Sequence, residues 1–379
     1  MNVLCVNMSL DAETGGGTAE RTSQLGIHLA RAGVDCRILT MSVGREGFTD
    51  EKENGLRIIA LPCLNARYFV PRISASVVQA VVNASDIVHI MGHWSLLNAF
   101  VYRMARTLRK PYVINAAGAL PIYGRSKILK RIYNMIVGHK IIRNASAWIA
   151  ITDAERNEYE EYGILRELVT IIPNAIDCKA IARRDDVAFR RKYGLAENPF
   201  ILFMGRINHI KGPDLLIQAF VDVKDKISPY HLVLAGPDGG MLYDLKRSVA
   251  RQGAEKLIRF IGYVGPEEKY LAYQAADLLV VPSRQEAMSI VALEAGVVGT
   301  PVVLTNQCGF HELALSGGAS VVDASASEIS RGILGVLSSQ DKLHMMKGKI
   351  QKYVVENYKW ENIVNKYLAV YERILSAVN

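Results

Sequence analysis

Short apolar strands alternate with amphipathic helices along most of the chain, and this alternation restricts the fold more than any other feature. After the first strand, Leu25, Leu29 and Ala32 recur at helical spacing, and the alternation starts again at Phe200. Strands that alternate with helices predict parallel sheets covered by helices on both faces. The expected strands are 3–8, 35–41, 56–61, 87–91, 112–115, 147–151, 169–172, 200–204, 231–235, 258–261, 278–281, one that opens at 301, and 320–322.

The chain is long enough for two domains, because 379 residues exceed what one ordinary core holds. The two runs of alternation predict an α/β fold with two Rossmann-like, doubly wound domains that face each other across a cleft. We place the N-terminal domain at 1–172 and the C-terminal domain at 173–361. The segment 342–378 is expected to be helical, with an interruption near 358–361.

Composition excludes several classes of protein. No run of 18 apolar residues is present, and no basic region precedes an apolar stretch at the N-terminus, so neither a membrane span nor a secretory signal is expected. The five cysteines occur singly without a CxxC pair, which indicates reduced, buried thiols in a cytoplasmic protein. The net charge is +8, and 87–152 contains no Asp or Glu. A basic surface of this kind suggests phosphates, nucleic acid or an anionic membrane as partner.

Candidate ligand-binding residues gather at the carboxyl ends of the expected strands, where such sheets bind ligands. A dinucleotide site fits poorly, because the first loop reads GGG instead of GxGxxG and no acid ends the second strand. Glycines there let a phosphate or sugar approach the backbone, or they form only a flexible turn. The segments concerned are 15–17, 205–211, 236–240, 262–264 and 286–294.

Arg206 and Lys211 are the strongest candidate pair. The guanidinium offers a planar fork of donors and the ammonium a mobile charge, which together suit a diphosphate without a metal ion. The alternative is that both are surface cations beside a helix start.

Glu286 and Glu294 flank a small apolar segment, 287–293, which predicts the first turns of a buried helix. Free backbone N–H groups near that N-terminus suit a phosphate. Glu294 would accept from a diol such as a ribose, and Glu286 would orient a sugar ring. The alternative is two solvated carboxylates near a helix start.

His89 and His93 lie four residues apart, but on an expected strand end this spacing does not suit a metal. A hydrogen-bonded histidine in the cleft and a purely structural one both remain open.

The segment 120–143 has the pattern of an interfacial helix facing anionic lipid. Leu129, Ile132, Tyr133, Ile136 and Val137 share one helical face. Lys127, Lys130 and Arg131 occupy the other. An ordinary amphipathic helix packed on the sheet would show the same pattern.

In their order and spacing, several segments resemble the retaining family 4 glycosyltransferases of the GT-B fold (glycosyl transferases group 1). The resemblance covers nearly the whole chain and is strongest over 171–303. It rests on IIPNAID, ILFMGRINHIKG, LVLAGPDGG, IRFIGYV, AADLLVVPSRQEAMSIVALEAGVVGTPVV and ENYKWENI.

This resemblance implies roles for individual residues. The catalytic set would be Arg206 and Lys211 on the diphosphate, with Glu286 from the family's E-x7-E element. The N-terminal domain would take the acceptor, helix 362–379 would cross back to it, and neither a metal nor another cofactor is expected. The implied donor-binding residues are Gly16, Gly17, Gly205, Gly236, Tyr263, Val264, Met288, Ser289, Ile290 and Glu294.

Two departures from the family concern the acceptor and the sugar. Relatives often read Glu-Gly-Phe-Gly where this chain has Glu286-Ala287-Met288-Ser289, so the pocket shape is expected to differ. A histidine that relatives often carry is absent from the run 115–118. His93, Asn115 and Gly118 are the remaining acceptor-side candidates.

The sequence thus predicts a metal-independent, retaining glycosyltransferase that moves a sugar from a nucleotide diphosphate sugar to an acceptor hydroxyl. Family frequency favours a UDP-sugar, and surface polysaccharide or glycolipid biosynthesis is the expected setting. The expected partners are this donor, a glycan or lipid-linked acceptor and the inner face of an anionic membrane, but no nucleic acid. The rivals are a phosphorylase or epimerase of the same fold and a non-catalytic nucleotide-sugar-binding subunit.

Overall fold

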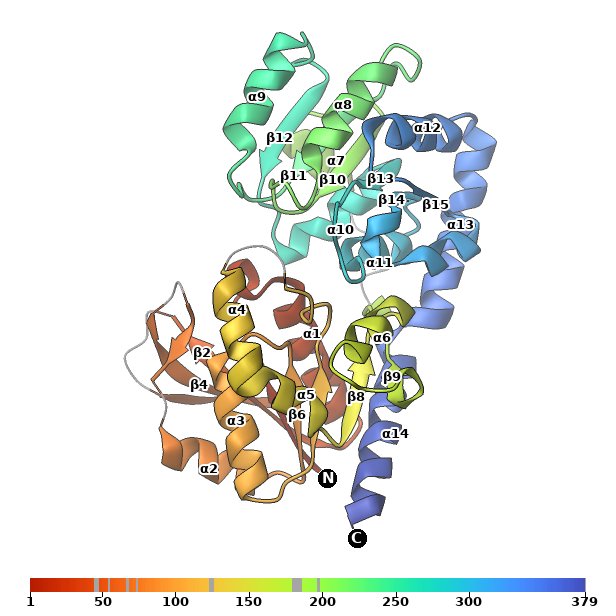
Figure 1. Ribbon diagram of the computed structural model, residues 1–379. Helices are drawn as coiled ribbons and strands as arrows, with labels where there is room; N and C mark the ends of the chain where they lie inside the picture. Colours follow the sequence, from red (N-terminus) through yellow and green to blue (C-terminus); the bar gives the residue numbers. More distant parts are fainter. Residues whose placement is uncertain are drawn as a thin grey trace. The chain divides into compact units, whose positions relative to one another are not determined.

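The computed structural model describes residues 1–43, 48–53, 55–65, 68–72, 74–122, 126–178, 186–195 and 198–378. The chain forms two compact units (Figure 1), one of Met1–Asn174 with Trp360–Asn379 and the other of Ala175–Lys359. Across the described ranges, none of the helices has the length and apolar character that a membrane span requires.

The first unit is built on a mainly parallel sheet in the order β3-β4-β2-β1-β6-β7-β8-β9, with β5 on β4. The central strands are buried along their length, so they form near-continuous apolar runs. Its strands are β1 (Asn2–Val6), β2 (Asp35–Ser42), β3 (Thr49–Glu53), β4 (Leu56–Asn65), β5 (Val70–Pro71), β6 (Ile87–Met91), β7 (Tyr112–Asn115), β8 (Ala147–Ala150) and β9 (Val169–Ile171). Its helices are α1 (Ala12–Arg31), α2 (Ala75–Asn83), α3 (Leu96–Thr107), α4 (Lys127–Tyr133), the π-helical η1 (Asn134–Gly138), α5 (His139–Arg143), α6 (Asp153–Glu160), η2 (Arg166–Leu168) and α14 (Trp360–Val378).

The last helix, α14, packs on the first unit, although it follows the second unit in sequence. Trp360 stacks on His28 with ring centroids 5.2 Å apart. Deeper in the unit, the buried Arg21 donates to the Tyr367 hydroxyl at 2.6 Å. Aromatic and polar contacts therefore fix α14 to this unit, as the resemblance implied.

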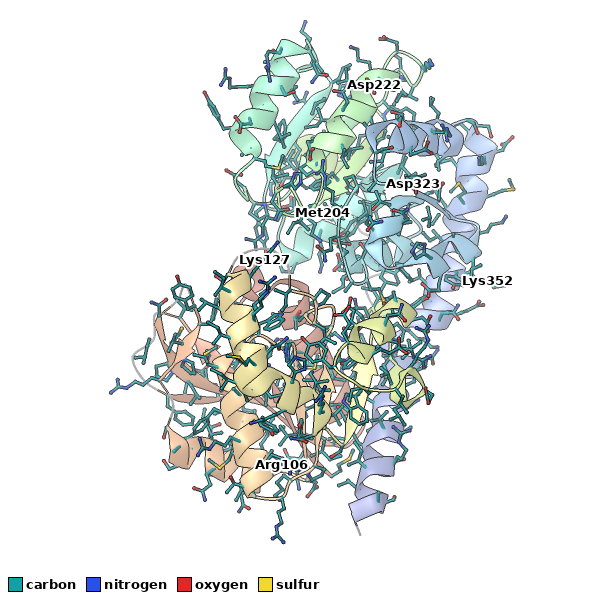
Figure 2. All side chains as sticks on the ribbon, viewed as in Figure 1. Arg106, Lys127, Met204, Asp222, Asp323 and Lys352 are labelled. Atoms are coloured by element: carbon teal, nitrogen blue, oxygen red, sulfur yellow. The ribbon has the colours of Figure 1, made fainter. Side chains whose placement is uncertain are left out.

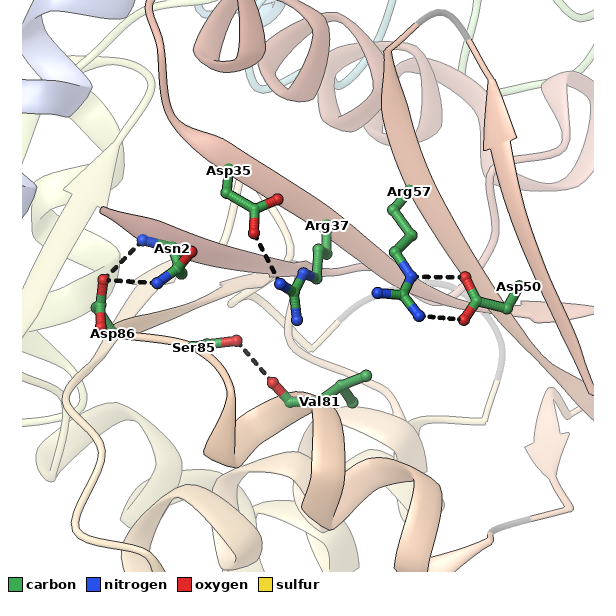
Figure 3. A network of polar contacts seen from close by, with 8 residues as sticks. All are labelled: Asn2, Asp35, Arg37, Asp50, Arg57, Val81, Ser85 and Asp86. Carbon is green, nitrogen blue, oxygen red and sulfur yellow. Dashed lines mark hydrogen bonds and ion pairs between the residues drawn. The ribbon is translucent and has the colours of Figure 1, made fainter.

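A separate set of polar contacts closes the amino end of the first sheet, and Figure 3 shows it. The backbone N–H of Asn2 donates to Asp86 at 2.7 Å, which joins β1 to the start of β6. Arg57 of β4 and Asp50 of β3 form a two-bond fork at 2.8 and 2.6 Å. The Asn2–Asp86 contact lies at the amino ends of β1 and β6, opposite the strand ends considered for ligand binding, and the Arg57–Asp50 fork joins the edge strand β3 to β4.

The second unit carries one parallel sheet in the order β12-β11-β10-β13-β14-β15. Its strands are β10 (Phe200–Met204), β11 (His231–Ala235), β12 (Ile258–Gly262), β13 (Leu278–Val281), β14 (Val302–Thr305) and β15 (Ala319–Val322). Its helices are α7 (Asp186–Lys192), α8 (Pro213–Val223), α9 (Leu242–Arg251), α10 (Pro266–Ala275), α11 (Ile290–Val297), the short η4 (Asn306–Cys308) and η5 (His311–Ser316), α12 (Ala326–Val336) and α13 (Gln340–Tyr358).

Several expected boundaries were wrong. The helix after Glu286 begins at Ile290 instead of 287, because the chain bends at 287–288, after the Glu286 N–H has donated to the carbonyl of Gln307. The segment 12–17, expected as a loop, is helical around a break at Gly16. The edge strands β3 and β5 were missed, since β3 reads TDEKE without apolar alternation. Within the charged run 179–191, helix α7 begins at Asp186, and 179–185 lies outside the described residues.

Candidate active site

Three strand ends of the second unit approach one another through glycines. A Cβ on Gly236, after β11, would collide with the carbonyl oxygen of Gly205, after β10. Gly212 has φ 66°, and a Cβ there would collide with the carbonyl oxygen of Pro282, after β13. Side chains at these positions would push the loops apart. The glycines therefore set the close packing of the loops that carry the predicted donor residues.

Lys211 and Glu286 form an ion pair between the loops after β10 and β13. The Glu286 side chain is 10% exposed and that of Lys211 33%. Burial lowers the pKa of Lys211 to about 8, and the nearby Arg206 cation acts in the same direction. Arg206 itself is exposed. The structure thus brings together Lys211 and Glu286 near the Arg206 cation. Their roles, the two cations on a diphosphate and the acid on a sugar, stay predictions.

Buried oxygens next to this pair have hydrogen-bonding capacity that the described residues do not use. Within the described ranges, Glu286 Oε2, Ser283 Oγ and Ser289 Oγ are buried and have no protein partner. Ser289 is the N-cap of α11, yet its side chain accepts no capping bond. A polar ligand with hydroxyl groups would supply the missing partners.

Arg284 connects the same two loops. Its backbone N–H donates to the carbonyl of Ile210 at 2.8 Å. Its guanidinium donates to the carbonyl of His209 at 2.8 Å and forms a fork with Asp214 at 2.9 and 2.6 Å. Arg284 was not predicted from the sequence, although it lies in the PSRQE segment used for the resemblance.

Glu294 lies inside α11 and is buried. Lys269 pairs with its Oε1 at 2.6 Å, and the Tyr273 hydroxyl donates to its Oε2 at 2.7 Å. Each carboxylate oxygen can still accept further bonds, so these partners leave capacity for a diol. Lys269 and Tyr273 were missed by the sequence analysis, although their spacing of four on α10 places both on one helical face.

The remaining donor-side positions differ in exposure. Tyr263 is 54% exposed, whereas Val264 beside it is buried, as are Met288 and Ser289. Ile290 is the first residue of α11, so its N–H and those of the next residues lack helical acceptors. In the first unit, Gly16 and Gly17 are exposed, and Gly16 has φ 55° and ψ −145°.

The acceptor-side candidates of the first unit are mostly buried. His93 is 1% exposed, and its Nε2 lies 2.8 Å from the Asn134 side-chain oxygen. Tyr133, Tyr162 and Trp94 surround the ring, and burial lowers the pKa of His93 to about 4. The structure supports a packing role for this neutral histidine, and a role towards an acceptor stays a prediction.

Asn115 and Gly118 border a turn after β7. Asn115 is buried and donates to the Tyr367 hydroxyl at 3.3 Å. The Gly118 N–H donates to the buried Glu155 at 2.6 Å, and the other Glu155 oxygen accepts from Ile151 at 2.6 Å. The sequence analysis missed Glu155, although TDAE at 152–155 fits a capping signature. The Glu155 carboxylate therefore joins the chain after β7 to the chain after β8 and does not cap its own helix, α6.

Among the described residues, the histidines of the first unit are not part of a metal-ligand cluster. His89 is buried within 2.7 Å of the Tyr371 hydroxyl. A search of the described residues finds no group of three or more His, Cys, Asp or Glu that could hold a metal ion. That catalysis needs no metal stays a prediction.

Comparisons with known proteins agree with the resemblance. The model for glycosyl transferases group 1 matches 185–366, and that for the glycosyl transferase 4-like domain matches 16–175. A D-inositol 3-phosphate glycosyltransferase of Corynebacterium urealyticum is 28% identical over 251 residues, which cover 63% of this chain and 59% of the relative. The chain thus matches about three-fifths of the length of this curated relative.

Two further proteins match over nearly their whole length. Mannosylfructose-phosphate synthase of Agrobacterium fabrum is 24% identical, over 96% of this chain and 87% of the relative. The structure of Anabaena HepE in complex with UDP and glucose has a TM-score of 0.79 at 19% identity, covering 98% of this chain and 100% of HepE. At that identity the likeness concerns the fold, and it confirms the predicted GT-B class.

Proposed function

Because the chain belongs to the glycosyl transferases group 1, we propose that it is a retaining glycosyltransferase that needs no metal and uses a nucleotide diphosphate sugar. The observation that carries this proposal is the pairing of Lys211 with Glu286 beside Arg206, at strand ends that glycines bring close together. A UDP-sugar is the donor we favour, since the similar HepE structure contains UDP and glucose.

In this proposal, Arg206 and Lys211 stabilise the charge on the departing diphosphate, the task of a metal ion in other enzymes. Glu286 orients the sugar with its unpartnered oxygen, and the N–H groups of the first turn of α11 bind a phosphate. Glu294 accepts from the ribose. The backbone at 263–264 contacts the base. The acceptor hydroxyl attacks from the face that the diphosphate leaves, which retains the anomeric configuration.

The proposal is tested by donor binding followed by turnover. A thermal-shift screen should show stabilisation by UDP-sugars above GDP- and ADP-sugars. UDP release should then depend on an added acceptor extract, persist with EDTA, and give a product with the donor's anomeric configuration by NMR. Binding without UDP release from any extract would support a non-catalytic subunit instead. Phosphate-dependent formation of a sugar 1-phosphate would support a phosphorylase.

The structure changes which residues form the apolar face that we expected over 120–143. Tyr133 and Val137 pack against the core of the first unit and do not belong to an outer apolar stripe. The outer side of α4 and η1 instead exposes five large apolar residues, which we call the α4 face. They are Ile128 (72%), Leu129 (54%), Ile132 (41%), Met135 (75%) and Ile136 (62%).

Basic residues border the α4 face, and acids are absent from 87–152. Lys127 (labelled in Figure 2) and Arg131 are exposed, and Lys130 lies 5.2 Å over the Trp94 ring. Exposed apolar side chains beside cations fit the headgroup region of an anionic bilayer better than they fit a partner protein whose surface carries few acids. We propose that this face docks on the inner face of the membrane, which favours a lipid-linked or surface-glycan acceptor.

Flotation with vesicles tests this docking. The protein should float with vesicles of phosphatidylglycerol and phosphatidylcholine, and less with phosphatidylcholine alone. Replacing Ile128 and Met135 by Asn should abolish flotation, and neutralising Lys127 and Arg131 should reduce it at low salt. The matched control is Met345→Asn, a similarly exposed methionine (57%) on α13. Failure of the wild type to float, or its concentration-dependent dimerisation through the α4 face, would contradict the membrane assignment.

A further inference from the structure

Lys211 and Glu286 come from separate loops, so their pairing depends on how these loops are held. β10 and β13 are neighbours in the sheet, with Ile201 opposite Leu278. Beyond the strands, 205–212 and 282–289 leave the sheet as irregular chain. A displacement of about 1 Å between such groups is enough to cost a large part of an enzyme's rate.

Arg284 makes the contacts that hold the Lys211 loop and the Glu286 loop in place relative to each other. It donates hydrogen bonds to three residues on either side of Lys211 in the chain. The acceptors are the carbonyls of His209 and Ile210 and the carboxylate of Asp214. Asp214 lies in the first turn of α8, so the fork also attaches the loop to a helix. The side chains of Arg284 and Asp214 are 26% and 31% exposed. An isolated ion pair with such exposure would contribute little to stability.

We propose that Arg284 is a positioning residue that holds Lys211 and Glu286 in register for a nucleoside diphosphate, without touching the ligand itself. This inference rests on the proposed function of the donor site. The planar guanidinium makes the fork to Asp214 and the bond to His209 at once. A lysine ammonium has one nitrogen, so it cannot reproduce this geometry.

The experiment compares Arg284→Ala, Arg284→Lys and Asp214→Ala with a control, Arg331→Ala. Arg331 is a 76% exposed arginine of the same unit that pairs with Glu328 at 2.8 Å. UDP affinity by calorimetry should fall about tenfold in Arg284→Ala. Arg284→Lys should restore little of it, and the double variant of Arg284 and Asp214 should be no worse than Arg284→Ala alone. Arg331→Ala should bind UDP as the wild type does.

Hydrogen exchange gives a readout that does not depend on a ligand. Exchange in 205–213 and 282–289 should become faster in Arg284→Ala and stay unchanged in Arg331→Ala. Unchanged exchange in these segments, or wild-type UDP affinity in Arg284→Ala, would overturn the positioning role. If the wild type bound no nucleoside diphosphate, the proposed function would be wrong. Faster exchange in Arg284→Ala would even then show that Arg284 holds the two loops together.

Discussion

Replacing Lys211 by alanine is expected to lower turnover at least a hundredfold while the protein stays folded. Lys211 supplies a charge-assisted contact to the leaving diphosphate, and the loss of one such contact typically costs about 3 kcal/mol of barrier. That corresponds to a rate factor on the order of 10². The change also leaves the Glu286 carboxylate without its partner, so a negative charge would face the diphosphate. The measurement is kcat for UDP release from the UDP-sugar.

Two companions make this result specific. Lys352→Ala removes a lysine of α13 that is 76% exposed (labelled in Figure 2), and it should keep wild-type turnover. The double replacement of Lys211 by Ala and Glu286 by Gln removes the unpaired carboxylate and should recover part of the UDP affinity but little of kcat. Turnover near wild type in Lys211→Ala would rule out the diphosphate role of this residue.

Much of the fold followed from the sequence because parallel strands are short, apolar and bounded by turn residues. The expected strands 87–91, 112–115, 200–204, 231–235 and 278–281 match the structure at both ends. The same logic failed for β3, which pairs at the sheet edge through its backbone and reads as a charged segment. It also failed at 287–289, which we expected in the helix. The chain bends there instead, next to the Glu286 N–H that donates to the carbonyl of Gln307.

The parts of the site that the sequence did not reveal are those that depend on long-range partners. Arg206, Lys211 and Glu286 stand at strand ends, and their order along the chain was enough to predict them together. Lys269 meets Glu294 only because α10 packs beside α11, and nothing in its local sequence indicates this. The apolar stripe expected over 120–143 was wrong in two of its five members for a similar reason. Periodicity defines a stripe, but only the packing of Tyr133 and Val137 shows which side is buried.

Replacing Glu294 by alanine is expected to affect both stability and ribose recognition. The change leaves the fully buried Tyr273 hydroxyl and the Lys269 ammonium, 21% exposed, without their carboxylate, which should cost about 2 kcal/mol. In a unit of this size the melting temperature should fall by roughly 4–8 °C. Recognition is measured separately, as the ratio of the affinities for UDP and for its 2′,3′-dideoxy analogue.

This ratio distinguishes a ribose contact from a merely structural acid. If Glu294 accepts from the ribose diol, the wild type should prefer UDP by about tenfold or more, since a site that hydrogen-bonds a hydroxyl discriminates against its absence. Glu294→Ala should lose this preference because no acceptor remains. The matched control is Tyr273→Phe, which deletes one bond to the same carboxylate but leaves it in place, so it should be destabilised yet still prefer UDP. If Glu294→Ala still preferred UDP over the dideoxy analogue, Glu294 would have only a structural role, which is to hold α10 against α11.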